Sequence, residues 1–209
     1  AGMKLMQTFG NKLKFFGIGG AKLDREVEKF LIEAKFPYAI GYGLTESAPL
    51  LAGVNPQNCR LQSTGPVVEG VQIKINNPDK KTGVGEIWAK GPNVMQGYYK
   101  DPETTKKMIS DDGWLKTGDL GVFDKDRYLY IKGRSKNVIL GPNGENVYPE
   151  ELESLINNFR HVAESLVLEK KGKLVALVHF NKEELEKIHQ QLHDGISEKV
   201  EEKIQELKE

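Results

Sequence analysis

The stretch KFFGIGGAKLDREVEKFLIEAKFPYAIGYGLTE, residues 14–46, decides the fold that we expect for the first part of the chain. Residues 14–18 and 36–40 are short apolar runs typical of buried strands. Between them, apolar side chains recur at the helical period, at Leu23, Val27, Phe30, Leu31 and Ala34. A strand, a helix and a strand in this order predict a βαβ unit, in which ligands bind beyond the carboxyl ends of the strands.

The next region, from about residue 65 to 131, has the pattern of a small β-rich subdomain. Residues 71–75 alternate apolar and polar side chains, and residues 86–89 form another short strand pattern. Residues 120–123 and 128–131 flank a polar turn and predict a hairpin. One helix is expected over residues 102–109.

The last region has the pattern of a small α+β domain. We expect a strand over residues 137–140 and a hairpin from residues 162–168 and 174–180. Pro149 suits the first turn of a helix, and the buried stripe expected for that helix is Leu152, Leu155 and Ile156. Residues 182–209 have an amphipathic helical pattern.

The predicted fold class is therefore α/β followed by α+β. Residues 1–132 form the first domain, with an α/β piece over 1–60 and the β-rich subdomain over 61–132. Residues 133–209 form the second domain.

Composition excludes several classes of function. Thirty basic and thirty acidic residues give a formal net charge of zero, so the chain lacks the basic footprint of a nucleic-acid-binding protein. No apolar run reaches the length of a membrane span, although peripheral membrane association and the oligomeric state stay open. The single cysteine, Cys59, fits a reducing, cytoplasmic location.

Polar motifs follow one another in a fixed order along the chain: Gly41–Glu46, Lys116–Asp119, Gly133–Lys136 and Asn143–Glu150. In the first motif, Tyr42 is a flat aromatic that can stack on a nucleobase. The glycines on either side of Tyr42 let the backbone approach the edge of the base.

The remaining polar side chains suit the rest of a nucleotide. The Thr45 hydroxyl can bond a phosphate oxygen, and the Glu46 carboxylate can hold Mg²⁺ together with phosphate oxygens. Asp119 can accept both ribose hydroxyls, and the planar fork of Arg134 can hold ribose or phosphate oxygens. Taken singly, each is also an ordinary turn former or surface cation, so the interpretation depends on their joint order.

Together these motifs resemble the adenylate-forming superfamily, whose members activate a carboxylate with ATP as an acyl-adenylate. The likeness runs from about Lys14 to Phe180 and is nearest to the long-chain-fatty-acid–CoA ligases. That branch is indicated by GLTESAP after Tyr42 and by NGENVYPEELE from Asn143. The resemblance implies a partial adenylate-forming fold, a fatty acid or other carboxylate as substrate, and ATP, Mg²⁺ and CoA as further reactants.

The resemblance also implies a role for each motif. Thr45 and Glu46 are the implied catalytic residues, Thr45 on phosphate and Glu46 on Mg²⁺. The residues implied to bind ATP or AMP are Gly19, Gly20, Ala21, Gly41, Tyr42, Gly43, Thr45, Asp119 and Arg134.

Two later residue groups are implied to act in the thioester step. Lys136 matches the hinge of the family, and Gly144 and Glu145 match a loop that swings toward the site. The implied reaction forms acyl-AMP and pyrophosphate. The second domain then rotates about Lys136 so that the CoA thiol can attack.

Two family elements are missing from this sequence. The Ser/Thr/Gly-rich phosphate loop is absent before Gly19, and the late catalytic lysine is absent, because Lys203 and Lys208 lie in a helical pattern. We therefore expect a fragment of a larger enzyme that has negligible ligase activity alone.

Two other interpretations stay open. One is a different adenylate-forming enzyme, such as an aryl-CoA ligase or a peptide-synthetase adenylation domain. The other is a non-catalytic nucleotide-binding or interaction module.

Overall fold

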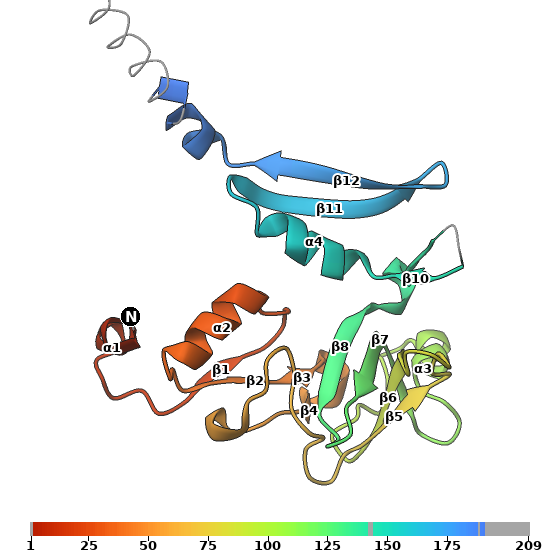
Figure 1. Ribbon diagram of the computed structural model, residues 1–209. Helices are drawn as coiled ribbons and strands as arrows, with labels where there is room; N and C mark the ends of the chain where they lie inside the picture. The colour runs from red at the N-terminus through yellow and green to blue at the C-terminus, as the bar shows by residue number, and fades with distance from the viewer. Residues whose placement is uncertain (1, 142–143, 188, 191–209) are drawn as a thin grey trace, which may run out of the picture. The chain divides into compact units, whose positions relative to one another are not determined.

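The computed structural model describes residues 2–141, 144–187 and 189–190 (Figure 1). The chain forms two compact units, Ala1–Val138 and Ile139–Glu209. The boundary expected between residues 132 and 133 falls inside β8 (Leu129–Arg134). It falls too early because Gly133 and Arg134 complete the last strand of a sheet in the first unit.

The βαβ unit predicted from the opening stretch is confirmed. After a short helix, α1 (Gly2–Thr8), it comprises β1 (Phe16–Ile18), α2 (Arg25–Glu33) and β2 (Tyr38–Ile40), and β1 and β2 pair in parallel. Helix α2 begins after Asp24, whose carboxylate accepts the backbone N–H groups of Glu26 and Val27. These two hydrogen bonds satisfy two of the backbone N–H groups that a helix leaves unpaired at its start.

The face that α2 buries differs from the expected stripe. The side chains of Val27 and Phe30 are 48% and 41% exposed, whereas Glu28 is fully buried. Leu31 and Ala34 do pack against the cluster around β2. The helical period is confirmed, but Val27 and Phe30 lie on the exposed side of the helix. Tyr38 and Gln62 place polar groups under the helix, and these groups bond Glu28.

Two short strands continue the chain beyond β2. They are β3 (Tyr42–Gly43) and β4 (Leu50–Ala52), which pair antiparallel across the 3₁₀ turn η1 (Thr45–Ser47). The hydroxyl of Ser47 accepts the backbone N–H of Leu44 and donates to the Pro49 carbonyl, which fixes this turn. A second 3₁₀ turn, η2 (Pro56–Asn58), follows.

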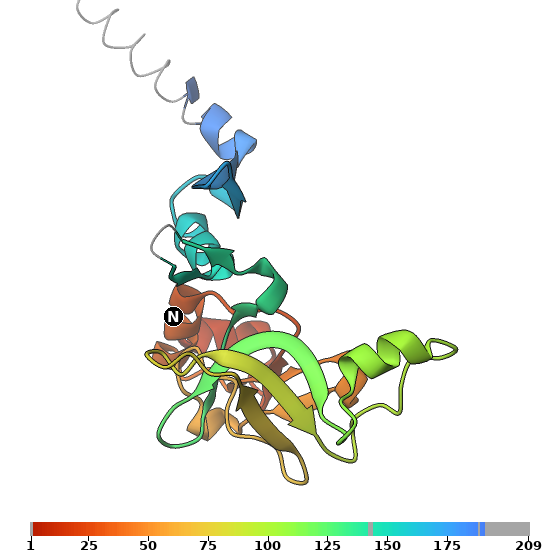
Figure 2. The same ribbon diagram turned by 90° about the vertical axis from the view of Figure 1, so that its right-hand side faces the viewer.

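The β-rich subdomain is an antiparallel four-stranded sheet in the order β5–β6–β7–β8. Its first three strands are β5 (Gln72–Asn76), β6 (Gly85–Lys90) and β7 (Leu115–Phe123), and the yellow-to-green strands of Figure 2 show this sheet. Helix α3 (Pro102–Met108) lies where a helix was expected. The residues buried in the main core are Tyr42, Leu51, Ala52, Ile73, Ile87, Ala89 and Leu129.

In the second unit, helix α4 (Pro149–Asn157) packs on a hairpin. The unit also contains β9 (Ile139–Leu140), β10 (Asn146–Val147), β11 (Val162–Lys170) and β12 (Lys173–Phe180). The hairpin and the helix starting at Pro149 were predicted, and β11 pairs with β12 antiparallel.

Two details of the second region differ from expectation. Leu155, expected in the buried stripe of α4, is 65% exposed, because the helix turns it away from β11. Asn137, expected to open a strand, instead ends the 3₁₀ turn η3 (Ser135–Asn137).

The predicted C-terminal helix is described only at its start, where residues 182–187 are helical, and residues 191–209 lie outside the described residues. None of the helices in the described part of the chain combines the length and the apolar character that a membrane crossing requires.

Candidate nucleotide site

The glycines of the candidate site lie where the two parallel strands end. The backbone N–H of Gly41 donates to the Ile18 carbonyl at 2.9 Å, so the chain leaves β1 and β2 at adjacent points. Gly20 turns away from β1 with φ of +84°, a left-handed conformation that favours glycine. The carboxyl edge of the parallel pair therefore carries Gly20 and Gly41, as the βαβ pattern predicts.

Gly43 is required by a close approach between β3 and β4. A side chain at this position would overlap the backbone carbonyl of Pro49. A side chain at Gly41 would likewise press on Leu50. The two glycines let the backbone on both sides of Tyr42 pass close to its neighbours.

Tyr42 is a core side chain with one polar contact. It is 9% exposed, and its hydroxyl donates to Oδ2 of Asp119 at 2.7 Å. Burial and the nearby charge of Asp119 raise the pKa of Tyr42 far above its ordinary value, so the phenol stays protonated and remains a donor. This bond joins β3 to β7 of the four-stranded sheet.

The carboxylate of Asp119 is oriented from two sides. Its Oδ1 lies 3.0 Å from Nε of Arg134, and these residues face each other across β7 and β8. Arg134 also donates to the Thr117 carbonyl at 3.1 Å, while the Thr117 hydroxyl accepts the backbone N–H of Asp119. These contacts fix the orientation of the Asp119 carboxylate at the edge of the cavity described next.

A cavity of about 210 Å³ lies between these groups. Seven of the nine residues predicted to bind ATP or AMP line it: Gly20, Ala21, Gly41, Tyr42, Gly43, Asp119 and Arg134. The folded first unit therefore brings together motifs that lie far apart in the sequence. Gln62 and Thr64 also line this cavity, although the sequence did not point to them.

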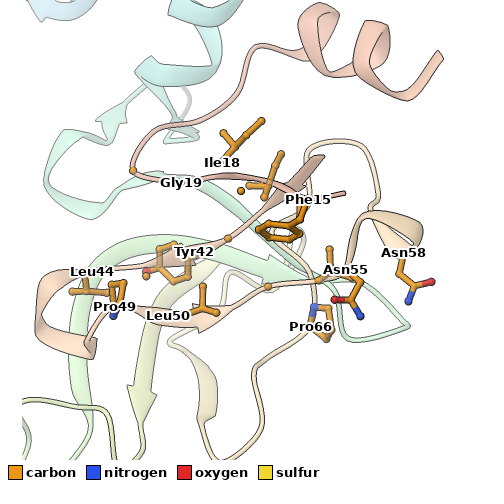
Figure 3. Close-up of a pocket in the computed structure, with 18 of the residues that line it drawn as sticks. Phe15, Ile18, Gly19, Tyr42, Leu44, Pro49, Leu50, Asn55, Asn58 and Pro66 are labelled. Atoms are coloured by element: carbon orange, nitrogen blue, oxygen red, sulfur yellow. The ribbon is translucent and has the colours of Figure 1, made fainter. Parts of the chain in front are cut away.

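A larger, mostly apolar cavity of about 900 Å³ shares part of this wall. Gly19 and Thr45, the other two predicted residues, line it together with Gly20 and Gly41–Gly43. Figure 3 shows Phe15, Ile18 and Leu50 around this space, with Tyr42 and Leu44 toward one end. Its lining suits an apolar group that reacts beside the nucleotide.

The turn η1 holds the two residues with implied catalytic roles. Thr45 is exposed at the start of the turn. Oε1 of Glu46 accepts the Tyr98 hydroxyl at 2.6 Å, and this bond raises the pKa of Tyr98. No group of three metal-ligating side chains occurs within the described ranges. Mg²⁺ can also be held by one carboxylate together with phosphate oxygens.

The residues implied in the thioester step lie outside this cavity. Lys136 is exposed in η3, close to the division between the units. Gly144, with φ of +74°, and Glu145 belong to a turn between β9 and β10 in the second unit. The turn is closed by a bond from the Gly141 N–H to the Glu145 carbonyl.

Comparison with known proteins agrees with this arrangement. Residues 3–99 match the family described as AMP-binding enzyme. Two solved structures superpose with a TM-score of 0.72. They are an O-succinylbenzoate–CoA synthetase from Bacillus subtilis in complex with ATP and magnesium (30% identity, 85% of this chain, 40% of that chain) and ATP-bound MatB from Rhodopseudomonas palustris (32% identity, 84% and 37%).

The chain belongs to the adenylate-forming superfamily.

Curated adenylate-forming relatives fall into more than one branch. A long-chain-fatty-acid–CoA ligase of Saccharomyces cerevisiae is 32% identical over 96% of this chain and 29% of the relative. A 4-coumarate–CoA ligase of Pinus taeda is 40% identical over 73% of this chain and 30% of the relative. The chain thus spans less than a third of the length of these adenylate-forming relatives.

The sequence did not predict the contacts that two residues make at the candidate site. Tyr98 lies outside the residues predicted to bind the nucleotide, yet its hydroxyl donates to Glu46. Gln62 lies in a polar loop with no motif around it, and only the contact to Glu28 reveals its position. A buried acidic residue in an amphipathic helix, Glu28, was the available signal, because such a residue needs donors elsewhere in the fold.

Proposed function

We propose that this chain contributes the nucleotide-binding portion of an ATP-dependent acid–CoA ligase acting on long-chain fatty acids in the cytoplasm. The observation that carries the proposal is the contact of Tyr42 and Arg134 with Asp119 at the edge of a cavity lined by the strand-ending glycines. A carboxylate held in this way can accept ribose hydroxyls and so fix the nucleotide beside the reacting acid.

The reaction would have two steps. The carboxylate oxygen of the acid attacks the α-phosphorus of ATP, forming a C–O–P bond as the bond to pyrophosphate breaks. The thiol sulfur of CoA then attacks the acyl carbonyl, and AMP leaves. Glu46 would hold Mg²⁺, which offsets phosphate charge, and Thr45 would donate to a phosphate oxygen.

Support for a fatty acid comes from two observations. The larger cavity is mostly apolar and begins at the same glycines as the nucleotide cavity. Similarity to the yeast fatty-acid ligase extends over 96% of the chain, against 73% for the pine aryl ligase. An aryl acid is the second candidate, because identity to the pine enzyme is higher within the shared part.

Binding of AMP to the 209-residue chain tests the nucleotide site directly. Asp119→Asn removes the charge but keeps the shape. We expect calorimetry to show about 10- to 100-fold weaker AMP binding, since hydrogen bonds to charged groups contribute about 1.5–3 kcal/mol. Asp126→Asn is the matched control, because Asp126 pairs with Arg60 outside the cavity and its loss should leave AMP affinity unchanged. Equal affinities for both variants would contradict the assignment.

ATP–pyrophosphate exchange with a panel of carboxylates tests the substrate class. The measurement uses the chain together with the flanking sequence of its gene. Exchange with fatty acids and subsequent thioester formation with CoA supports the proposal, whereas exchange with aryl acids alone moves the substrate to the second candidate. Exchange with no acid contradicts the ligase assignment and favours a binding module.

The same preparation tests Lys136 as a hinge. Proline fixes φ and limits backbone rotation at this position. We expect Lys136→Pro to retain pyrophosphate exchange and to lose thioester formation. Equal loss of both steps would argue against a hinge at Lys136.

A further inference from the structure

A buried carboxylate lies directly behind the nucleotide cavity. Glu28, on the inner face of α2, is fully buried. Its Oε1 accepts the Tyr38 hydroxyl at 3.0 Å, and its Oε2 accepts two bonds from Gln62. Carboxylates are rarely buried without a cation, and an apolar residue of similar volume often serves stability as well or better. Packing alone therefore does not explain a buried carboxylate at this position.

Tyr38 holds one side of this carboxylate. Its side chain is buried on β2, and burial together with the charge of Glu28 raises the pKa of its phenol well above the ordinary value. The hydroxyl is therefore protonated at neutral pH and donates to Glu28. Oε2 of Glu28 is left to face Gln62.

Gln62 is bound at both its backbone and its side chain. Its N–H donates to Oε2 of Glu28 at 2.8 Å, and Nε2 of its side chain donates to the same oxygen at 2.7 Å. Its φ is +64°, a left-handed conformation that costs a side-chain-bearing residue energy and that glycine would adopt freely. Strain of this kind concentrates at functional sites, which points to a function for the Gln62 side chain.

The bonds to Gln62 fix which way its amide points. Nε2 donates to Glu28 and, at 3.1 Å, to the carbonyl of Leu23. Both partners can only accept, so the amide nitrogen must face them and its oxygen must face the other way. Gln62 and Leu23 both line the 210 Å³ cavity, and no donor from the described residues bonds the Gln62 amide oxygen.

We propose that Gln62 is a base-specificity residue, whose amide oxygen accepts a hydrogen bond from the exocyclic amino group of adenine. Glu28 and Tyr38 are positioning residues that hold this amide. The inference rests on the proposed nucleotide site and adds the group that selects the base. A purine with a 6-oxo group would place an acceptor against the Gln62 oxygen and would be rejected.

Calorimetric binding of three nucleotides to the 209-residue chain tests this assignment. They are AMP, purine riboside 5′-monophosphate, which lacks only the 6-amino group, and inosine 5′-monophosphate, which carries the 6-oxo group. The wild-type chain should bind AMP about fivefold or more tightly than purine riboside 5′-monophosphate, the effect of one neutral hydrogen bond, and inosine 5′-monophosphate more weakly still.

Gln62→Gly removes the amide and suits the left-handed backbone, so the variant should stay folded. It should bind AMP and purine riboside 5′-monophosphate equally. Gln57→Gly, in the exposed turn η2, is the matched control and should keep the wild-type preference. Glu28→Gln should reduce the preference for AMP while leaving the affinity for ribose 5-phosphate unchanged, a pattern that a general loss of stability would not give.

The outcomes separate the two proposals. A wild-type chain that binds none of the nucleotides overturns the proposed nucleotide site, and the base-specificity assignment with it. Binding without a preference for AMP, or a preference that survives in Gln62→Gly, overturns the assignment of Gln62 alone.

Discussion

The four-stranded sheet of the first unit and the β11–β12 hairpin of the second bury their apolar side chains to very different extents. In the sheet, Ile87, Leu115 and Leu129 are fully buried. In the hairpin, Val167 is the buried apolar residue, and Leu166, Leu177 and Phe180 are about half exposed. Both regions are antiparallel, and each contains at least one register shift, so strand pairing alone does not produce a core.

The difference comes from what covers each face. One face of the sheet packs on β4 and Tyr42, whereas the hairpin packs on helix α4. A two-stranded hairpin gains its stability mainly from such a covering element. Residues of the sheet should therefore contribute much more to the free energy of unfolding than residues at equivalent positions of the hairpin.

The largest expected effect is a direct test of this contrast. Ile87→Ala should lower the free energy of unfolding by about 2–5 kcal/mol, because it leaves a cavity in the core. Leu177→Ala, at a position that is 56% exposed in β12, should change it by about 0.5 kcal/mol or less. Urea unfolding followed by the fluorescence of Trp88 and Trp114 measures the first unit, and circular dichroism follows both. Similar costs for the two variants would remove the distinction between the regions.

A second, smaller effect concerns buried polar groups. Glu28→Ala should cost about 1–3 kcal/mol, because it leaves the Tyr38 hydroxyl and the Gln62 N–H without an acceptor. Glu164→Ala in β11 is the control, since the Glu164 side chain is 78% exposed and should be nearly neutral. Urea unfolding measures both variants. A Glu28→Ala variant with an unchanged free energy of unfolding would show that water replaces the lost acceptor.

The N-cap of α2 gives a third test within the first unit. Asp24→Ala should cost about 1 kcal/mol, because the N–H groups of Glu26 and Val27 lose their acceptor. Asp24→Ser should recover most of this loss, as serine also caps helices. The measurement is the midpoint temperature of thermal unfolding. Equal midpoints for Asp24→Ala and Asp24→Ser would show that the cap does not stabilise α2.

The smallest expected effect depends on pH. The backbone N–H of Thr104 holds the pKa of Asp101, the N-cap of α3, below its ordinary value of about 4. The stability that this contact adds is complete above that ordinary value and is lost as pH falls through the lowered folded-state pKa. Hydrogen exchange of the backbone amides measures this effect. We expect the Thr104 amide to exchange faster than the amides of β12 as pH falls through that acid range. Exchange of Thr104 that follows β12 would contradict it.

The sequence was sufficient for the elements that follow a simple period. The parallel pairing of β1 and β2, the sheet strands and the hairpin all depend on local patterns. The order of the polar motifs along the chain pointed to Tyr42, Asp119 and Arg134, which line one cavity. The buried face of α2 could not be read in this way. Apolar residues lie on more than one side of that helix, and the donors that bury Glu28 come from β2 and a distant loop.

The hydrogen bond from Tyr42 to Asp119 also bears on folding. The two residues are 77 positions apart, so the bond forms only after a long loop has closed and the sheet has assembled. Closing such loops is entropically unfavourable, so the bond depends on the other long-range contacts that bring β3 and β7 together. A nucleotide that binds there would bind only the completed fold and would raise its melting temperature by mass action. The rise in melting temperature with nucleotide concentration would therefore measure binding to the completely folded unit.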